Sequence, residues 1–214
     1  MDLTLHYAPS NASMTPHIVL REIGVPFRLA LVDRSQAAHK SPAYLKLNPN
    51  GLIPVLQHGE QVLYETAAIV LHLVDHFPQA HLAPRLGTPE RSEFYKWLAW
   101  LATGPQAMMS HYFYSDRLVA PGNAAGAAEV KAQAEAKIAT QIDQIETRLA
   151  QQPWMLGEDY SALDPYVFML CRWTRGMTRP ARTLPHLGPW LQKMLQRPAV
   201  RGALDAEGLT APYV

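Results

Sequence analysis

A proline-rich segment divides this sequence into two regions with different hydrophobic periodicity. Residues 78–89, PQAHLAPRLGTP, contain three prolines and no regular apolar spacing, which is typical of a linker. Before this segment, short strand and helix patterns alternate. After it, nearly every periodic stretch has the three-to-four-residue spacing of a helix. The sequence therefore predicts an α/β domain at residues 1–80, a linker at 81–88 and an all-helical domain at 89–214.

The first region predicts the element order βαβαββα of a thioredoxin-like domain. Thr15 is the expected N-cap of the first helix, with Pro16 at its first position and Gly24 just past its end. Gly59–Glu60 is expected to join the last two strands as a hairpin. The expected strands are 3–7, 26–33, 53–58 and 61–65, and the expected helical segments are 16–23, 43–49 and 67–77.

The second region predicts a helical bundle. A helix is expected to start at Thr88–Pro89–Glu90, a long helix to cover about residues 129–149, and a last amphipathic helix roughly 185–196. Ser161 and Asp164 have the spacing of a capping box ahead of the apolar run PYVFMLCRW. The expected fold class is thus α/β plus all-α.

Charge and cysteine content exclude several classes of function. The 19 basic and 18 acidic residues give a formal charge of +1, which argues against a nucleic-acid partner. Cys171 is the only cysteine, so intrachain disulfides and CxxC motifs are impossible. The N-terminal residues do not resemble a signal peptide, and no apolar run approaches the roughly 20 residues that span a bilayer. We expect a cytoplasmic protein without a membrane partner.

Four segments together resemble the cytosolic glutathione transferases, most nearly the bacterial beta class. They are YAPSNASMTPHIVLREIGVPF, NPNGLIPVL, YETAAIVLHL and SALDPYVFMLCRW, and they occur in the family's order over nearly the whole chain. The resemblance implies a glutathione-binding thioredoxin-like domain, a helical domain that supplies most of the pocket for an electrophile, and a homodimer. Glutathione would be the co-substrate, and no metal is expected.

The resemblance also implies a set of glutathione-binding residues. Ile53–Pro54 matches the family's cis-proline segment, whose backbone pairs with the cysteinyl part of glutathione. Glu65 and Thr66 match the acidic-then-hydroxyl pair that holds the γ-glutamyl end, at the start of a helix that favours a carboxylate. His39 and Lys40 are possible partners for the glycine carboxylate, with a solvated loop as the alternative.

The loop after the first strand departs from the beta-class pattern. Ala12 stands where beta-class proteins usually have a cysteine, so a mixed disulfide with glutathione at that position is impossible. Glutathione conjugation needs a thiolate, and a donor near the sulfur or a helix N-terminus stabilises one. Ser13 is the first candidate donor and Asn11 the second, with Tyr7 a third by chemistry. The alternative is that the hydroxyl residues of this loop only cap the helix.

Aromatic and sulfur-containing residues of the helical region are candidates for the electrophile pocket. His111 matches a beta-class histidine that reaches toward the ligand's sulfur. Met109, Tyr112 and Tyr114, together with Tyr7, suit an apolar acceptor pocket. Packing in the core or in a dimer interface is the alternative for this cluster.

One histidine pair has a spacing that can bind zinc. His72 and His76 are four residues apart, but Leu73 stands where the HExxH motif has its glutamate. We therefore expect solvated or partly packed histidines and no metal.

The sequence favours a glutathione transferase that conjugates the glutathione thiolate to small electrophiles in detoxification. A glutathione-dependent reductase or thioltransferase is the first alternative, and Ala12 argues against it because that chemistry favours a cysteine in the loop. A non-catalytic protein that binds glutathione or an apolar ligand is the second.

Overall fold

The computed structural model describes residues 2–214, and the chain divides into two compact units. The first contains residues up to Ala83 together with Met194–Tyr213, and the second contains Pro84–Lys193 and Val214. Among the described residues, no helix combines the length and the apolar character that crossing a membrane requires.

The first unit is built on a four-stranded mixed sheet with the strand order β2-β1-β3-β4. Strand β1 (Leu3–Tyr7) pairs in parallel with β2 (Arg28–Leu31). It pairs antiparallel with β3 (Val55–His58), and β3 pairs antiparallel with β4 (Gln61–Tyr64). This topology confirms the thioredoxin-like fold class. Strands β2, β3 and β4 are shorter than expected, and β1 has the expected bounds.

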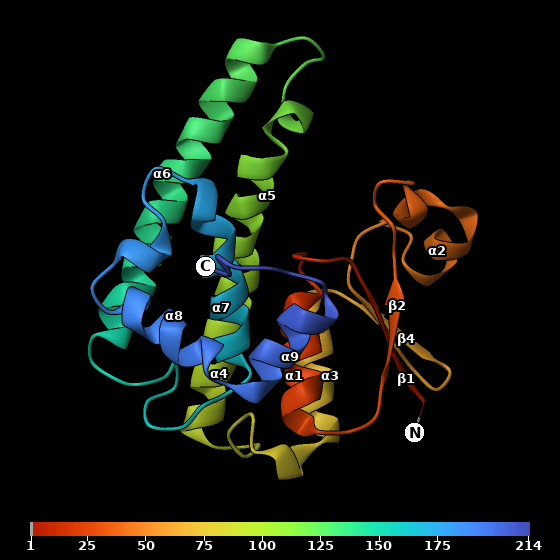
Figure 1. Ribbon diagram of the computed structural model, residues 1–214, viewed down its shortest axis with the longest axis vertical. Coiled ribbons are helices and arrows are strands. Elements are labelled where there is room, and N and C mark those ends of the chain that lie inside the picture. Colours follow the sequence, from red (N-terminus) through yellow and green to blue (C-terminus); the bar gives the residue numbers. More distant parts are fainter. Residues whose placement is uncertain (1) are drawn as a thin grey trace. The chain divides into compact units, whose positions relative to one another are not determined.

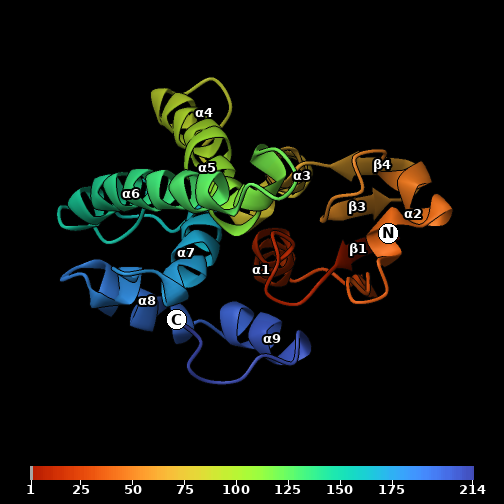
Figure 2. The same ribbon diagram turned by 90° about the horizontal axis from the view of Figure 1, so that it is seen from above.

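Helices cover both faces of this sheet. Helices α1 (Met14–Ile23) and α3 (Thr66–His76) lie on one face, and α2 (Pro42–Leu47) lies toward the other, as Figure 1 and Figure 2 show. Short 3₁₀ segments, η1 (Ala38–Lys40) and η2 (Pro78–Ala80), complete the connections. Gly24 ends α1 with φ 77°, a left-handed conformation that glycine adopts without strain.

The N-cap of α1 is Ser13, two residues before the expected Thr15. Met14 and Thr15 are fully buried and belong to the first turn. Burial of Met14 in the core stabilises the longer helix, and its effect exceeds the local capping preference that favoured Thr15.

The last helix of the chain belongs to the first unit, which differs from the expected assignment of residues 89–214 to one helical domain. Helix α9 (Pro198–Ala206) packs against α1 and buries Val200, Ala203 and Leu204. Arg197, at the start of α9, makes a bidentate ion pair with Glu22 of α1. Its Nε donates to Oε1 at 2.7 Å and its Nη2 donates to Oε2 at 3.0 Å. The sequence prediction ended its last helix at about residue 196 and missed α9.

The second unit is helical throughout, as expected. Thr88 caps α4 by accepting a hydrogen bond from the Arg91 N–H at 3.2 Å. Pro105 lies in a π-helical turn between α4 and α5, where its missing N–H breaks the regular ladder. The helices are α4 (Pro89–Leu101), η3 (Ala102–Gln106), α5 (Ala107–Phe113), η4 (Ser115–Leu118), α6 (Ala124–Leu149), α7 (Leu163–Trp173), η5 (Thr174–Gly176), η6 (Ala181–Thr183) and α8 (Leu187–Leu195).

The predicted capping box of α7 forms as a buried hydrogen-bond network around Ser161 and Asp164. Ser161 N–H donates to Asp164 Oδ2 at 2.8 Å, and the Ser161 hydroxyl accepts from Leu163 N–H at 3.3 Å. The second Asp164 oxygen accepts from Met155 N–H at 3.0 Å. Both polar side chains are buried, and they bind backbone N–H groups and each other, the Ser161 hydroxyl donating to Asp164 Oδ2 at 3.2 Å, which fits a folding role.

Candidate glutathione site

The strand register brings three separate parts of the chain to one end of the sheet. His6 of β1 lies opposite Val55 of β3, and Val55 lies opposite Tyr64 of β4. The next residue outward on each strand is therefore Tyr7, Pro54 and Glu65, respectively. The loop after β1, the start of β3 and the start of α3 meet at this end, as the sequence prediction requires.

The Ile53–Pro54 peptide bond is cis, as expected. The loop before it is held by two donors that share one acceptor. Tyr44 OH donates to the Leu52 carbonyl at 2.8 Å, and Asn48 Nδ2 donates to the same carbonyl at 2.9 Å. Burial raises the pKa of Tyr44 to about 12, so its hydroxyl stays protonated and remains a donor at neutral pH. The backbone leading into Pro54 is thus fixed before any ligand arrives.

The predicted glycine-carboxylate partners lie beside this same loop. Lys40 Nζ donates to the Asn50 carbonyl at 3.3 Å, and the side chain remains exposed. Gly51 has φ +61°, and a Cβ there would lie 2.7 Å from Lys40 Nζ and 2.9 Å from the His39 carbonyl oxygen. Only glycine allows this close approach. Lys40 therefore presents a cation near the cis-proline segment, and its role toward a ligand remains a prediction.

Two polar side chains at the start of α3 make no hydrogen bond within residues 2–214. Glu65 has φ 72°, an uncommon conformation for a residue with a side chain, and its carboxylate makes no capping hydrogen bond. Such strain costs on the order of 1–3 kcal/mol and is common at ligand-binding sites. Thr66 is only 3% exposed, and its hydroxyl has no hydrogen-bond partner among the described residues. An acidic side chain and an unpaired hydroxyl thus lie together at a helix start.

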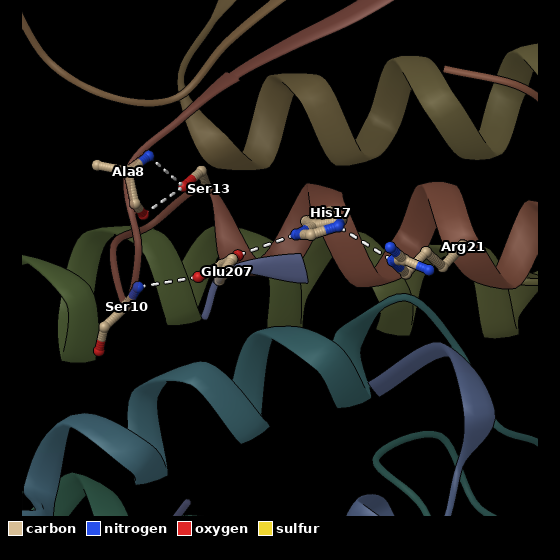
Figure 3. Close-up of polar contacts among 6 residues, drawn as sticks. All are labelled: Ala8, Ser10, Ser13, His17, Arg21 and Glu207. Atoms are coloured by element: carbon tan, nitrogen blue, oxygen red, sulfur yellow. Dashed lines mark hydrogen bonds and ion pairs between the residues drawn. The ribbon is translucent and has the colours of Figure 1, made fainter. Parts of the chain in front are cut away.

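The Ser13 hydroxyl closes the loop between β1 and α1. It accepts a hydrogen bond from the Ala8 N–H at 3.3 Å and donates to the Ala8 carbonyl at 3.2 Å, as Figure 3 shows. The residue is fully buried. The Ser13 hydroxyl therefore uses its donor and an acceptor position on the Ala8 backbone. This favours the alternative that Ser13 stabilises the loop and does not donate to a ligand.

Asn11 has a more available donor. The side-chain Oδ1 accepts from the Ala12 N–H at 2.8 Å, and the backbone carbonyl accepts from the Met14 N–H at 3.0 Å. The side-chain NH₂ has no hydrogen-bond partner within residues 2–214. Asn11 is partly exposed, whereas Ala12 is buried. Of the two candidate side chains in this loop, Asn11 is the one with an unused donor.

A buried chain of polar groups anchors the loop to the last helix, and sequence reasoning missed it. The Glu207 carboxylate accepts from the Ser10 N–H at 2.9 Å and lies 2.9 Å from His17 Nδ1, as Figure 3 shows. Arg21 Nε donates to His17 Nε2 at 3.0 Å, which leaves His17 Nδ1 as the ring nitrogen that donates to Glu207. Both side chains of the His17–Glu207 pair are fully buried.

This network fixes Ser10 in a left-handed conformation with φ 59°. No sequence pattern indicates the contact between Ser10 and Glu207, because the two residues are 197 positions apart and Glu207 lies outside every motif. Gly202 permits the approach of α9, since a Cβ there would lie 2.6 Å from Arg21 Nη1. The loop that faces the predicted glutathione thiol is thus held by a helix from the end of the chain.

Tyr7, the third candidate donor, lies at the end of β1. Its ring is 6.3 Å from the His17 ring, centroid to centroid, and the residue is partly exposed. This contact turns one side of Tyr7 toward the buried polar network. A direct role in either thiol activation or the electrophile pocket stays a prediction.

In the second unit, the expected pocket residues separate into core and surface. Met109 is fully buried and Tyr112 is 9% exposed. His111 lines a pocket of about 480 Å³ between α5 and α6, with Met108 and Val130 in the same wall. Tyr114 is partly exposed, with the Arg117 guanidinium 4.2 Å from its ring centroid. Met109 and Tyr112 therefore fit the core-packing alternative, and His111 retains access to a ligand.

Cys171 cannot replace the absent loop thiol. The residue is buried in α7, and burial raises the pKa of its thiol, with the nearby Glu146 carboxylate adding to the effect. A buried neutral thiol is a poor nucleophile. Any thiolate chemistry in this protein must use the sulfur of a bound ligand.

The chain combines a thioredoxin-like unit with a helical unit. Residues 9–76 match the family description "Glutathione S-transferase, N-terminal domain", and residues 128–206 match "Glutathione S-transferase, C-terminal domain". Glutathione S-transferase GST-4.5 of Xanthomonas campestris is 30% identical over 213 residues, which cover 97% of this chain and 100% of the relative. The protein belongs to the glutathione S-transferase family.

Two solved structures and a second relative are similar to nearly the whole chain. A glutathione transferase homolog from Sulfitobacter with bound glutathione has a TM-score of 0.87, 27% identity, and coverage of 97% of this chain and 99% of its own. The beta-class enzyme of Sphingomonas chungbukensis has a TM-score of 0.84, 29% identity, and coverage of 97% and 100%. Disulfide-bond oxidoreductase YfcG of Escherichia coli is 29% identical and covers 94% of each chain.

Proposed function

We propose that this protein is a glutathione transferase that conjugates the glutathione thiolate to small electrophiles. The observation that carries the proposal is the unsatisfied start of α3 next to the cis-proline. The strained Glu65 offers a carboxylate for the ligand's α-ammonium, and the buried Thr66 hydroxyl matches its α-carboxylate. The first N–H groups of α3 add further donors for that carboxylate.

The other groups at this end of the sheet extend the site along the tripeptide. The fixed backbone at Pro54 suits pairing with the cysteinyl part, and Lys40 suits the glycine carboxylate. This order puts the ligand's thiol at the loop after β1. Titrating glutathione into the wild type and Glu65→Gln tests the order, with an expected loss of about 10- to 100-fold in affinity because a charge-assisted hydrogen bond is lost.

The control for that titration is Glu60→Gln, which changes an exposed carboxylate in the β3–β4 turn. Its affinity for glutathione should equal that of the wild type. If Glu65→Gln binds glutathione as well as Glu60→Gln does, α3 does not hold the γ-glutamyl end and the proposed site is wrong.

Thiol activation is assigned to the Asn11 amide together with the start of α1. A free thiol has a pKa of about 8.5, and lowering it by roughly 2 units requires about 2.7 kcal/mol in favour of the anion. The Asn11 NH₂ supplies a hydrogen bond to the sulfur, and the positive end of α1 supplies electrostatic stabilisation. Ser13 has the supporting role of holding the loop closed.

Asn11→Asp tests whether this side chain faces the sulfur. The variant keeps an oxygen for the Ala12 N–H but removes the amide donor and adds a negative charge. Thiolate absorbance of bound glutathione, followed against pH, should shift to higher pH, and the rate of conjugation to an activated aryl chloride should fall at neutral pH. An unchanged titration would assign activation to the backbone and helix alone.

Disulfide reduction through bound glutathione is the second candidate, favoured by the relative named a disulfide-bond oxidoreductase. It would proceed without a protein thiol in the loop, because Ala12 occupies the beta-class cysteine position. Comparing aryl-chloride conjugation with reduction of a glutathione mixed disulfide ranks the two activities. Saturable glutathione binding with neither activity would favour ligand carriage.

We also infer a cytoplasmic homodimer. The family resemblance supports it, and so do the exposed apolar side chains of the first unit, Leu52 at 56% and Val62 at 40% exposure. Light scattering on the purified protein should give about twice the 23.9 kDa chain mass. A mass of one chain across micromolar concentrations would contradict the dimer.

A further inference from the structure

Three histidines come together at the end of the sheet opposite the glutathione site. His58 ends β3, while His72 and His76 lie on the last two turns of α3. One ring nitrogen from each of the three lies within 4.8 Å of the others. The His58 and His72 rings are joined by a 2.9 Å contact between Nδ1 and Nε2, and the His58 and His76 ring centroids are 4.4 Å apart.

The local structure explains why these three side chains converge. His72 and His76 are four residues apart and therefore project from one face of α3. His58 lies on the same face of β3 as the buried Leu56, because side chains alternate along a strand. That face is the one on which α3 packs, so the strand supplies a third imidazole to the helical pair.

We propose that His58, His72 and His76 form a binding site for a divalent transition metal ion such as zinc. Three imidazoles with an open fourth position for water are a donor set that zinc, copper and nickel accept. The helical pair alone lacks the glutamate of HExxH, and sequence spacing therefore predicted no metal. His58 adds a third ligand that no sequence motif connects to α3.

The distances suit an ion of this size. With metal–nitrogen bonds of 2.0–2.1 Å and tetrahedral geometry, ligand nitrogens lie about 3.3 Å apart. The 2.9 Å pair needs to open slightly, and the other separations need only a small ring movement to close. The ion takes the place of the proton shared by His58 and His72, and that proton moves to the outer nitrogen of its ring.

The surroundings favour a cation and leave it accessible. His58 and His72 are half-buried, and His76 is exposed, which leaves an entry path and a position for water. The cluster also lies at the C-terminal end of α3, where the helix dipole favours a positive charge.

The metal site is separate from the glutathione site, although both use β3 and α3. Pro54 and His58 are four residues apart along a strand, which is about 13 Å. Thr66 and His76 are ten residues apart along a helix, which is about 15 Å. A bound ion would join the far ends of the two elements whose near ends hold glutathione, without contacting the ligand.

The test is zinc binding by the untagged, full-length protein after treatment with a chelator. Glutathione is left out because its own thiol binds zinc. Competition against a chromogenic zinc chelator should show one ion per chain. His58→Gln should weaken the affinity by at least the 10- to 100-fold that even an outer-shell change commonly costs. The control His186→Gln removes an exposed histidine of the second unit and should leave the affinity unchanged.

Two results would overturn the proposal. One is binding by His58→Gln that equals the wild type, because the helical pair would then act alone. The other is no stoichiometric binding by the wild type, which would leave a hydrogen-bonded histidine cluster. Thermal unfolding without metal checks that the variant folds. If it does not fold, the copper(II) electron paramagnetic resonance spectrum of the wild type decides, with three coordinated ring nitrogens expected and two or fewer contradicting the site.

Discussion

The starts of helices α1 and α3 lie in the same unit but satisfy their polar groups in different ways. At the start of α1, the Ser13 hydroxyl binds Ala8 in both directions, and the Ser10 N–H is bound by Glu207. At the start of α3, Glu65 makes no capping hydrogen bond and the Thr66 hydroxyl has no partner among residues 2–214. The polar groups at the start of α1 are therefore hydrogen-bonded within the chain. The side-chain polar groups of Glu65 and Thr66 at the start of α3 have no such partners among residues 2–214.

This difference distinguishes polar groups that stabilise the loop from polar groups that are available to bind a ligand. A buried polar group without a partner costs about 1–3 kcal/mol, so a structure that tolerates one gains something else from it. We infer that the start of α3 is completed by glutathione, whereas the start of α1 is a rigid support for the loop that faces the thiol. The following predictions test the two halves of this comparison.

The largest expected effect is from breaking the closure at α1 with Glu207→Gln. The variant removes the charge from a buried carboxylate that binds both His17 and Ser10, and it places an amide donor against one of two N–H groups. A hydrogen bond to a charged acceptor contributes about 1.5–3 kcal/mol, and the substitution weakens one of the two and opposes the other with a donor. Urea unfolding should show a loss of that order, together with faster hydrogen exchange of the loop between β1 and α1.

The neighbouring exposed carboxylate supplies the control for this experiment. Asp205→Asn lies on α9 two residues from Glu207 and should change the stability by no more than about 0.5 kcal/mol. Equal effects of the two substitutions would mean that the His17–Glu207 pair does not anchor the loop.

The second prediction concerns the incomplete start of α3. Thr66→Val keeps the shape of the side chain but removes its buried, unpaired hydroxyl. In the absence of glutathione the variant should be more stable than the wild type, by about 1 kcal/mol or more. Its affinity for glutathione should fall, because the hydroxyl that binds the carboxylate is gone. Thermal unfolding and calorimetric titration measure the two effects.

A loss of stability on Thr66→Val would mean that the hydroxyl already has a favourable environment in the free protein. The comparison between the helix starts would then fail at α3. Thr88→Val provides the opposite case, since Thr88 caps α4 and its hydroxyl accepts a hydrogen bond from Arg91 N–H. That variant should lose about 1 kcal/mol.

Local patterns and family resemblance predicted most of the fold but only part of the site. Alternation and turn residues located β1 and the β3–β4 hairpin, and motif order located Pro54, Glu65 and Thr66, because each depends on residues close in sequence. Glu207 of the buried polar network and His58 of the proposed metal site were missed. Their roles depend on tertiary packing of α9 on α1 and of α3 on the sheet, which no local spacing encodes.

Ser13 illustrates the same limit within a correctly located loop. Its position suggested a donor for the thiol, since the sequence places a hydroxyl at the start of a helix. Only the direction of the side chain reveals that both bonding positions are used by Ala8. Asn11, ranked second by sequence, has the donor that remains available. Residue type and spacing cannot distinguish these two cases, because side-chain direction is set by burial.

The smallest expected effect on the ionisation of bound glutathione is from Ser13→Ala, which tests this reversal directly. The variant deletes both hydrogen bonds to Ala8, each with a net contribution of about 0.5–1.5 kcal/mol, and should therefore lower the free energy of unfolding by roughly 1–3 kcal/mol. The pH at which bound glutathione ionises should stay at the wild-type value in Ser13→Ala and rise in Asn11→Asp. If the thiolate titration shifts in Ser13→Ala and not in Asn11→Asp, the hydroxyl reaches the sulfur. The start of α1 would then take part in binding as α3 does.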